Sequence, residues 1–417
     1  MQTQLKKEIK IERTSIRLLA DVSKVLLRYL DFGMDKERIS SIYHFIQNLS
    51  DSEVKEALFE IYNDFQQRHF DLKEKLMKHY QNVAENLPGR LTENRKLLLG
   101  SYFTHEYSVQ ASALFNPSIV PHPNQSGLSD GDLRFLMSLR STGEGHISSI
   151  SFCEGIVKQS GEIEIEPTSE KISSGLVDIS EQPYSVRFGE DHPISSQVLF
   201  PQTQAERMGM EDARFVYLES EQRYVGTYTA YDGHKIKPEL IVTDDFKTFE
   251  VGGLSGSAAS NKGLALFPRK INGKYAMIGR QGGRSLSIMY SDNLFNWEES
   301  ALLQSPARSW EMLQIGNNGS PIETEHGWLL LTHGVGPMRK YTLSLSLLDL
   351  HNPGQLIASL DQPLMTPNQE EREGYVPNVL YTCGMLKKDE ELIIPYAMSD
   401  SAISFAKVSI SEVIGNL

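Results

Sequence analysis

The chain has 417 residues, of which 40% are hydrophobic and 23% are charged, as in ordinary globular proteins. Its 54 acidic residues exceed its 41 Lys and Arg residues and give a net charge of −13. This balance argues against nucleic acids and anionic membranes as partners, because these are bound by basic faces. No apolar run approaches the ~18 residues of a membrane span, and the start of the chain lacks an apolar signal core. We therefore expect a soluble, cytoplasmic protein with two domains or one large repeat fold.

Residues 1–98 are predicted to form an α-helical region. Apolar residues recur there at intervals of three and four, glycine is nearly absent, and the first proline is Pro88. Because nothing in the region converges chemically, we expect it to pack on the rest of the chain or to form a homo-oligomer interface. Ser50 or Asp51 is expected to cap the third helix. The predicted helices cover residues 15–30, 38–50, 50–70 and 72–83.

Residues 99–417 have the opposite character and are predicted to form a mainly β domain. Glycine, proline, serine and aromatic residues become frequent, and short apolar runs lie between turns. Five runs resemble one another at spacings typical of propeller blades, and each ends in a polar residue. We therefore predict a five-bladed β-propeller; the alternative is five unrelated strands with solvent-facing ends. The runs are residues 133–141, 223–233, 273–283, 327–335 and 391–400, with polar ends Arg140, Asp232, Arg280, His333 and Asp400.

These polar strand ends define a candidate site, because equivalent strands of a propeller converge on one axis. Carboxylates, amides and aromatic faces suit a sugar, and clustered cations suit an anion. Cys153 and Cys383 are far apart, and the chain has no zinc-ligand spacing, P-loop or dinucleotide fingerprint. We therefore expect neither a metal nor an organic cofactor. Further candidates are Asn116, Asp212, Arg214, Tyr228, Tyr231, Asn261, Lys262, Arg284, Trp310, Trp328 and Tyr341.

The segment GMEDARF, residues 209–215, raises a separate question. Glu211 and Asp212 stand directly before an apolar strand, although acidic residues are depleted in strands. The pair is either a solvated turn or a catalytic acid with Arg214 set to hold it.

Six stretches, in order between residues 115 and 384, carry a resemblance to a known family. This region resembles glycoside hydrolase family 130, the inverting β-mannoside phosphorylases and β-mannosidases. The resemblance implies a five-bladed β-propeller for residues 99–417, and residues 1–98 lie outside it. The matching stretches are FNPSI (115–119), GMEDARF (209–215), YTAYDG (228–233), NKGLALFPRKINGKYAMIGR (261–280), GNNGSPIETEHGWLLLTHGV (316–335) and YVPNVLYTCG (375–384).

The resemblance also implies roles for individual residues. Asp212 matches the family's general acid, which passes its proton through the mannose 3-hydroxyl to the glycosidic oxygen. Ala213 stands where the family usually has proline, a departure that affects backbone stiffness more than chemistry. Arg214 is expected to pair with Glu211 or to orient the acid. The substrate-binding residues implied are Asn116, Arg140, Glu211, Arg214, Tyr231, Asp232 and Asp400.

A second group of residues matches positions at or near the family's phosphate site. Lys262 stands where arginine is commoner, so the charge is kept and the bidentate fork is lost. Gln314 stands roughly where the phosphorylases carry a lysine. That loss leaves hydrolysis open, with Glu311 or Glu323 as the base that an inverting hydrolase needs. The phosphate-binding residues implied are Lys262, Arg280, His333 and Tyr341.

The function expected from the resemblance is phosphorolysis of β-manno-oligosaccharides, with inorganic phosphate as co-substrate and α-mannose 1-phosphate as product. One alternative is an inverting β-mannosidase of the same fold. The other is a carbohydrate-binding propeller that has lost catalysis. The linkage cleaved, the acceptor sugar and the number of subunits stay open at this point.

Overall fold

A computed structural model describes residues 9–33, 35–85 and 87–417. The chain divides into two compact units. The β unit contains Gln110–Thr168 and Ser174–Leu417, together with the described residues up to Asp21. The helical unit contains the described part of Val22–Val109, together with Ser169–Ser173. Across the described ranges, none of the helices is both long enough and apolar enough to cross a membrane.

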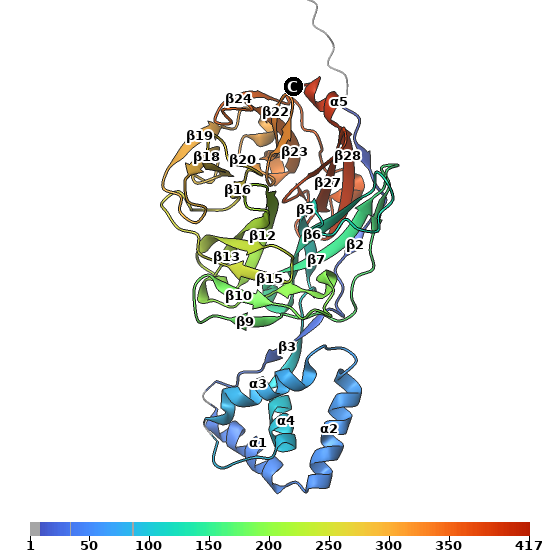
Figure 1. Ribbon diagram of the computed structural model, residues 1–417, viewed down its shortest axis with the longest axis vertical. Coiled ribbons are helices and arrows are strands. Elements are labelled where there is room, and N and C mark those ends of the chain that lie inside the picture. Colours follow the sequence, from blue (N-terminus) through green and yellow to red (C-terminus); the bar gives the residue numbers. More distant parts are fainter. Residues whose placement is uncertain (1–8, 34, 86) are drawn as a thin grey trace, which may run out of the picture. The chain divides into compact units, whose positions relative to one another are not determined.

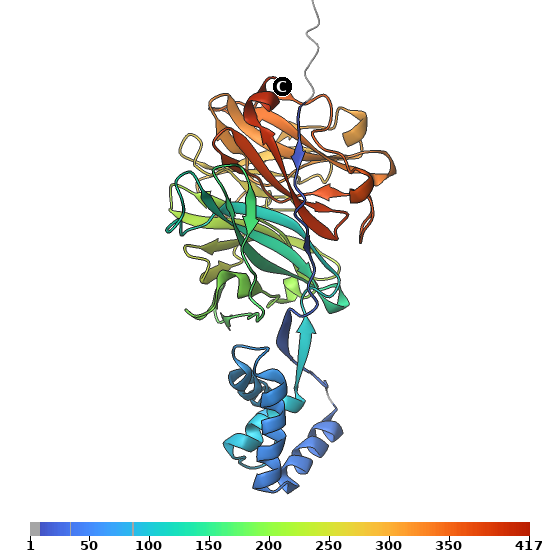
Figure 2. The same cartoon turned by 90° about the vertical axis from the view of Figure 1, so that its right-hand side faces the viewer.

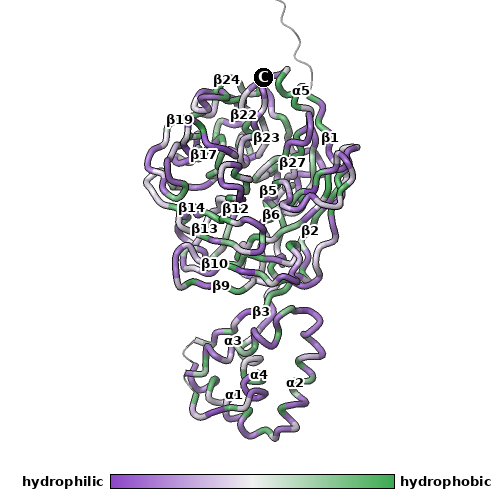
Figure 3. Tube along the Cα trace, in the orientation of Figure 1, coloured by the Kyte–Doolittle hydropathy of each residue, from purple (hydrophilic) through white to green (hydrophobic). Residues whose placement is uncertain are grey.

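The helical unit holds four helices and one strand pair. Three of the predicted helices are confirmed, and Ser50 is the N-cap of the second: its side chain accepts from the Glu53 N–H while the Glu53 carboxylate accepts from the Ser50 N–H. Hydrophobic and hydrophilic residues interleave along each helix (Figure 3), so one face of each can be buried. The elements are α1 (Lys36–Asn48), α2 (Asp51–Phe65), α3 (Leu72–Ala84) and α4 (Glu93–Tyr102), with β3 (Val25–Tyr29) antiparallel to β4 (Thr104–Ser108).

The prediction of a helix over residues 15–30 is wrong. This stretch contains β2 (Leu18–Leu19) and β3, and β1 (Glu12–Arg13) precedes it. β1 and β2 pair with β28 (Ala402–Ser409), as Figure 2 shows where the blue N-terminal segment runs along the red C-terminal strands. An open strand edge offers the backbone hydrogen bonds that outweigh a weak helix propensity. The expected helical region of residues 1–98 is therefore shared between the two units.

The β unit is built of antiparallel sheets that follow one another in chain order around the unit (Figure 1). One sheet contains β5–β8 and a neighbouring set of strands, β9, β10 and β12–β15, joined through the parallel pair Gly209–Ser148. β11 adds to β7. The strands of this sheet are β5 (Ala113–Pro121), β6 (Leu133–Thr142), β7 (Ser148–Val157), β8 (Ile163–Ile165), β9 (Leu176–Asp178), β10 (Tyr184–Arg187), β11 (Val198–Leu199), β12 (Gly209–Leu218), β13 (Arg223–Tyr231), β14 (Ile236–Thr243) and β15 (Thr248–Val251).

Three further sheets complete the unit, and the short helix α5 (Ile410–Ile414) ends it. Each of the five runs predicted to be strands contains a strand of the structure, namely β6, β13, β17, β22 and β27. The first sheet is β16 (Ala265–Leu266), β17 (Tyr275–Gly279), β18 (Leu286–Ser291) and β19 (Ser300–Gln304); the second is β20 (Gln314–Asn317), β21 (Ile322–Thr324), β22 (Gly327–Val335), β23 (Tyr341–Leu348) and β24 (Leu356–Ser359); the third is β25 (Leu380–Tyr381), β26 (Leu386–Lys388), β27 (Glu391–Met398) and β28 with β1 and β2.

Apolar clusters pack each sheet against the next. Trp297 lies in a cluster between β12–β14 and β16–β18, and Trp328 lies in one between β17–β18 and β20–β22. Tyr396 belongs to a cluster that joins β22–β23 to β27–β28. Phe405 packs on Phe135 with ring centroids 5.9 Å apart, so the last sheet also contacts the first. Residues on or next to strands of all these sheets line one cavity.

Candidate active site

A polar cavity of about 220 Å³ lies in the β unit. Four of the five predicted polar strand ends line it, namely those of β6, β17, β22 and β27. The fifth, Asp232, is not among the described lining residues; its carboxylate accepts from the N–H groups of His234 and Lys235 in a turn. The lining residues are Asn116, Arg140, Asp212, Lys262, Arg280, Gln314, His333, Arg339, Tyr341, Val376, Val379, Tyr381 and Asp400.

Two β-bulges aim the first pair of side chains into this cavity. The pairing of β5 with β6 shifts between Phe115 and Ser118, and that of β12 with β13 shifts between Glu211 and Arg214. Within the bulges, Asn116 has φ 50° and Asp212 has φ 55°. Such left-handed backbone is strained for a side-chain-bearing residue and is common next to active sites. The Asn116 amide donates to Asp212 Oδ1 at 2.7 Å.

Arg140 holds both acids of the GMEDARF segment. Its guanidinium donates to Asp212 Oδ1 at 3.1 Å and to Glu211 Oε1 at 2.9 Å. Lys262 Nζ bonds the other oxygen of Glu211 at 2.6 Å. Glu211 is buried behind the cavity wall and binds two cations, and it is absent from the described lining residues. The segment is therefore no solvated turn: Asp212 faces the cavity and Glu211 fixes the cations beside it.

The two carboxylates that line the cavity have opposite charge preferences. Burial alone would raise the pKa of Asp212, but Arg140, Arg214 and Lys262 lower it to about 2. For Asp400, burial and the nearby charge of Asp212 raise the pKa to about 7. Near neutral pH, Asp212 is thus ionised in the empty site while Asp400 titrates. Groups with pKa values pushed apart in one cavity are typical of sites that move protons.

Arg214 stabilises the β-bulge that contains Asp212. Its guanidinium donates to the backbone carbonyl of Asp212 at 3.2 Å and to the hydroxyl of Tyr381 at 2.7 Å. It has no ion pair with Glu211 among the described residues, so of its two predicted roles the structure favours orienting the acid. Arg214 is 2% exposed and is not a lining residue.

Several of the other lining residues are cations. Arg280 is partly buried and has no carboxylate partner among the described residues; its Nη1 lies 3.4 Å from His333 Nε2, and its buried Nε has no hydrogen-bond partner. Burial lowers the pKa of this guanidinium, as expected for an unpaired buried cation. The ring of Tyr341 stacks on His333 at 5.6 Å between centroids. A buried cation that lacks a partner inside the protein is a site for an external anion.

Three other predicted residues lie elsewhere. Tyr231 donates its hydroxyl to the Gly233 carbonyl and lines no part of the cavity that the structure describes. Glu311, a candidate base, is fully buried and accepts from the N–H groups of residues 307 and 308. Glu323, the other candidate base, forms a two-pronged ion pair with Arg269. Neither glutamate faces the cavity.

Sequence reasoning missed several lining residues. Tyr381 lies within the quoted stretch YVPNVLYTCG, so its motif was recognised but its role was not. Arg339 lies on a turn after β22, with φ 54°, and no strand pattern predicts it. Val376 and Val379 supply the apolar wall. Among the described residues, no group of three or more His, Cys, Asp or Glu side chains is placed to hold a metal ion.

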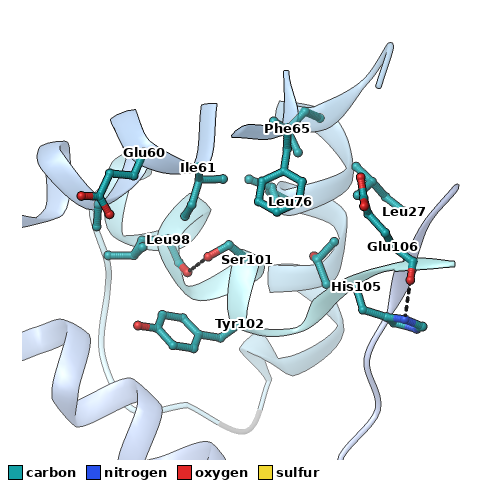
Figure 4. A pocket seen from close by; sticks show the side chains of 13 residues that line it. Leu27, Glu60, Ile61, Phe65, Leu76, Leu98, Ser101, Tyr102, His105 and Glu106 are labelled. Carbon is teal, nitrogen blue, oxygen red and sulfur yellow. Dashed lines mark hydrogen bonds between the residues drawn. The ribbon is translucent and has the colours of Figure 1, made fainter. Parts of the chain in front are cut away.

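A second cavity, of about 400 Å³, lies within the helical unit (Figure 4). Its walls are mainly apolar side chains such as Ile61, Phe65 and Leu98. Two of the polar residues that Figure 4 labels are engaged locally: Ser101 donates to the Leu98 carbonyl at 2.7 Å, and His105 contacts the Glu106 carbonyl at 3.1 Å. This cavity is larger than the polar one, but it holds no convergent set of ionised groups.

Comparison with known proteins gives consistent matches. A family model described as beta-1,4-mannooligosaccharide phosphorylase matches residues 167–417. A 1,2-beta-oligomannan phosphorylase of Thermoanaerobacter sp. is 32% identical over 229 residues, which are 54% of this chain and 74% of that protein. A beta-1,4-mannooligosaccharide phosphorylase of Ruminococcus albus is 31% identical over 215 residues, 49% of this chain and 63% of that protein.

Solved structures show a similar fold. The beta-1,2-mannobiose phosphorylase from Listeria innocua, in complex with beta-1,2-mannobiose, has a TM-score of 0.55 at 19% identity, covering 75% of this chain and 93% of that one. A putative glycoside hydrolase from Parabacteroides distasonis has a TM-score of 0.56 at 19% identity, covering 74% and 90%. Asn116 and Arg140 precede the range matched by the family model, so their place beside Asp212 rests on the structure of this chain.

Proposed function

Because the chain belongs to glycoside hydrolase family 130, we propose that it is a glycoside phosphorylase that cleaves β-manno-oligosaccharides with inorganic phosphate and releases α-mannose 1-phosphate. One observation carries the proposal: a single cavity is lined both by the carboxylate of Asp212 and by the guanidinium of Arg280, which has no carboxylate partner among the described residues. An inverting phosphorylase needs this division, with an acid for the leaving group and a cationic site for the attacking phosphate.

The acidic side of the cavity binds the mannose and protonates the leaving group. Asn116, Arg140 and Asp400 surround Asp212 and supply donors and acceptors for sugar hydroxyl groups. Asp212 is the general acid, acting through the mannose 3-hydroxyl. Its low pKa in the empty site means that it must gain a proton as the complex forms. A phosphate dianion beside Arg280 offsets the surrounding cations and raises the pKa of Asp212 toward the range of a useful acid.

The cationic side binds phosphate through Lys262, Arg280, His333 and Tyr341. Hydrolysis is disfavoured because it needs a carboxylate base on the face opposite the acid. Glu311 and Glu323 accept hydrogen bonds from other groups, and neither is among the described residues that line the cavity. Asp400 lies near Arg140 on the same side as Asp212. A purely binding role would leave the strained backbone of Asp212 unexplained.

We also propose that the β unit is a five-bladed propeller. Its blades would be β5–β8, β12–β15 with β9 and β10, β16–β19, β20–β24, and β25–β28 with β1 and β2. The apolar clusters between successive sheets, and the contact of the last sheet with the first, support this arrangement. The N-terminal strands would complete the last blade and so connect the two ends of the chain's β unit.

The helical unit is proposed to mediate a homo-oligomer. Phe59 on α2 is 65% exposed and Phe45 on α1 is 53% exposed, more than apolar side chains of this size normally leave in water. Phe59→Glu is expected to lower the mass measured by light scattering. Leu302→Glu, at a β19 position that is 68% exposed, is the matched control and should leave the mass unchanged. An unchanged mass in both variants contradicts the interface.

A cytoplasmic location is part of the proposal. Cys153 and Cys383 are both buried and free, as is usual where thiols are kept reduced. Cell fractionation tests the location, and recovery of the activity outside the cytoplasm would contradict it.

Turnover of β-1,2- and β-1,4-mannobiose, with and without inorganic phosphate, tests the reaction. Phosphate-dependent release of mannose 1-phosphate is expected, and the faster substrate identifies the linkage. Free mannose formed at the same rate without phosphate would establish a hydrolase. Binding of both disaccharides without turnover would leave only a carbohydrate-binding protein.

A further inference from the structure

The imidazole of His333 is held in one orientation and one protonation pattern by residues that no part of the mechanism has used. Asn318 is 1% exposed and its Nδ2 donates to the backbone carbonyl of Thr382 at 2.7 Å. A carbonyl only accepts, so the amide orientation of Asn318 is fixed. Its Oδ1 therefore faces His333 Nδ1, at 2.9 Å, and Nδ1 must carry the hydrogen of that bond.

The other ring nitrogen is left as an acceptor. His333 is buried at 2% exposure, and burial together with Arg280 and Arg214 places its pKa well below the ordinary value, so the ring is neutral. Its Nε2 lies 3.4 Å from Arg280 Nη1 and 3.2 Å from Gln314 Nε2. A guanidinium can only donate, so this contact independently shows that Nε2 is unprotonated and accepts through its lone pair.

The backbone fixes this arrangement closely. Gly316 on β20 pairs with His333 on β22, and a Cβ at Gly316 would lie 2.3 Å from His333 Cε1. The glycine lets the ring lie against the neighbouring strand. Two donors share one lone pair at distances longer than the usual 2.9–3.0 Å, so neither bond is strong and a better donor from a ligand can replace one of them.

The basic residues that line the same cavity can only donate, and its tyrosines can donate as well. Arg280, Lys262 and Arg339 carry N–H groups, and Tyr341 carries a hydroxyl. A cavity made of donors alone would bind sulfate and phosphate alike. The hydrogenphosphate dianion differs from sulfate at one point, since one of its oxygens bears a hydrogen. An acceptor at one position of the anion site separates the two ions.

We propose that His333 Nε2 accepts a hydrogen bond from the P–O–H group of hydrogenphosphate, and that Asn318 is the positioning residue that keeps this nitrogen an acceptor, so that the site selects protonated tetrahedral oxyanions over sulfate. This inference rests on the proposed function, because it assigns the phosphate of that reaction to this side of the cavity. With sulfate, the lone pair of Nε2 meets an oxygen lone pair, and the mismatch is repulsive. The Gln314 amide, freed from Nε2, then donates to another phosphate oxygen.

Titration calorimetry of the full-length protein with sodium phosphate, arsenate and sulfate tests the inference without turnover. Phosphate and arsenate are expected to bind, and sulfate at least ~10-fold more weakly, the factor for one lost hydrogen bond to a charged group. Equal binding of sulfate and phosphate overturns the inference, and so does the binding of neither. Phosphorolysis with equal sulfate binding would overturn this inference and leave the proposed function standing.

Asn318→Asp tests the positioning role. The carboxylate still accepts from Nδ1, but it favours a second proton on the imidazole, and Nε2 then donates. Sulfate binding relative to phosphate is expected to rise to within about threefold. Gln314→Lys is the matched control, since it adds a cation while Nε2 stays a hydrogen-bond acceptor. It should strengthen the binding of both sulfate and phosphate and leave the ratio of their affinities unchanged. An unchanged ratio in folded Asn318→Asp protein overturns the role of Asn318; should that variant not fold, the anion ratio of the unaltered protein decides the matter.

Discussion

The two cavities of this protein differ in what their polar groups do. The cavity of the helical unit is about 400 Å³ and largely apolar, and Ser101 and His105 in its wall bond to neighbouring backbone. The cavity of the β unit is only about 220 Å³, but it holds a partly buried cation, Arg280, without a carboxylate partner among the described residues, and a carboxyl group whose pKa is raised to about 7. Unsatisfied charge marks a reactive site more clearly than volume does.

The largest effect expected from this difference follows Asp212→Asn. The amide keeps the contacts to Asn116 and Arg140 but cannot transfer a proton, so we expect kcat to fall by at least ~10²-fold. Asp245→Asn is the control, because Asp245 only accepts from backbone N–H groups in a turn. Near-normal turnover of the Asp212→Asn protein in phosphate and mannobiose would remove Asp212 from the acid role.

The second effect concerns the unpaired cation. Arg280→Gln removes the charge that an anion would pair with, and we expect the KM for phosphate to rise by about 10- to 100-fold, in line with the loss of a charged hydrogen bond. Arg269→Gln breaks the ion pair with Glu323 instead and should leave that KM unchanged. A rise limited to the KM for mannobiose would move the anion to another part of the cavity.

Asp400→Asn tests the raised pKa through stability. The pKa of Asp400 in the fold is about 7, above its ordinary value of 3.8. Its neutral form therefore contributes stability that is fully present below the ordinary value and is lost as the pH rises through 7. The substitution should raise the melting temperature at pH 8 by roughly 2–3 °C, for a gain on the order of 2 kcal/mol, and by clearly less at pH 5, where only part of this stability has been lost. The same shift at both pH values would show that Asp400 is not the titrating group.

The sequence could predict this site where strands repeat and could not where the chain turns. Arg140, Arg280, His333 and Asp400 lie near the ends of strands in four different sheets, and a period of short strands is visible in the sequence. Asp232 occupies the same place in its run, but its carboxylate closes the turn to Lys235. A polar residue after an apolar run can either cap a turn or lie at the end of a strand that lines the site. The sequence pattern is the same in both cases, so it does not distinguish them.

Long-range partners were beyond the sequence for a different reason. Arg214 meets Tyr381 across 167 positions, and Asn318 meets Thr382 across 64. Single side chains that find one another through sheet packing leave no local period. The wrong helix at residues 15–30 has the same cause, because its apolar spacing suits either structure and the strands with which it pairs, β28 and β4, decide between them.

A smaller effect is expected from Lys262→Arg. Lys262 Nζ is bound to Glu211 at 2.6 Å, so its charge is largely used inside the protein. A guanidinium can keep that ion pair and still direct a second N–H group to phosphate. We expect the KM for phosphate to fall about threefold, as for one added weak hydrogen bond, with kcat little changed. Lys270→Arg, on a lysine that lies over the ring of Tyr275, is the control. A higher KM for phosphate would mean that the site needs the small ammonium group of lysine rather than the larger guanidinium.

The smallest effect should come from the larger cavity. Ala57→Leu adds apolar volume to the wall of the helical cavity, next to Ile61 and Leu98. Filling apolar space changes stability by up to ~1 kcal/mol in either direction, depending on how the side chain fits. No ionised group converges there, so kcat and both KM values should stay within about twofold, the scatter expected for a remote substitution. A tenfold change in phosphorolysis would show that the helical unit acts on the reaction, and the contrast between a reactive small cavity and an inert large one would fail.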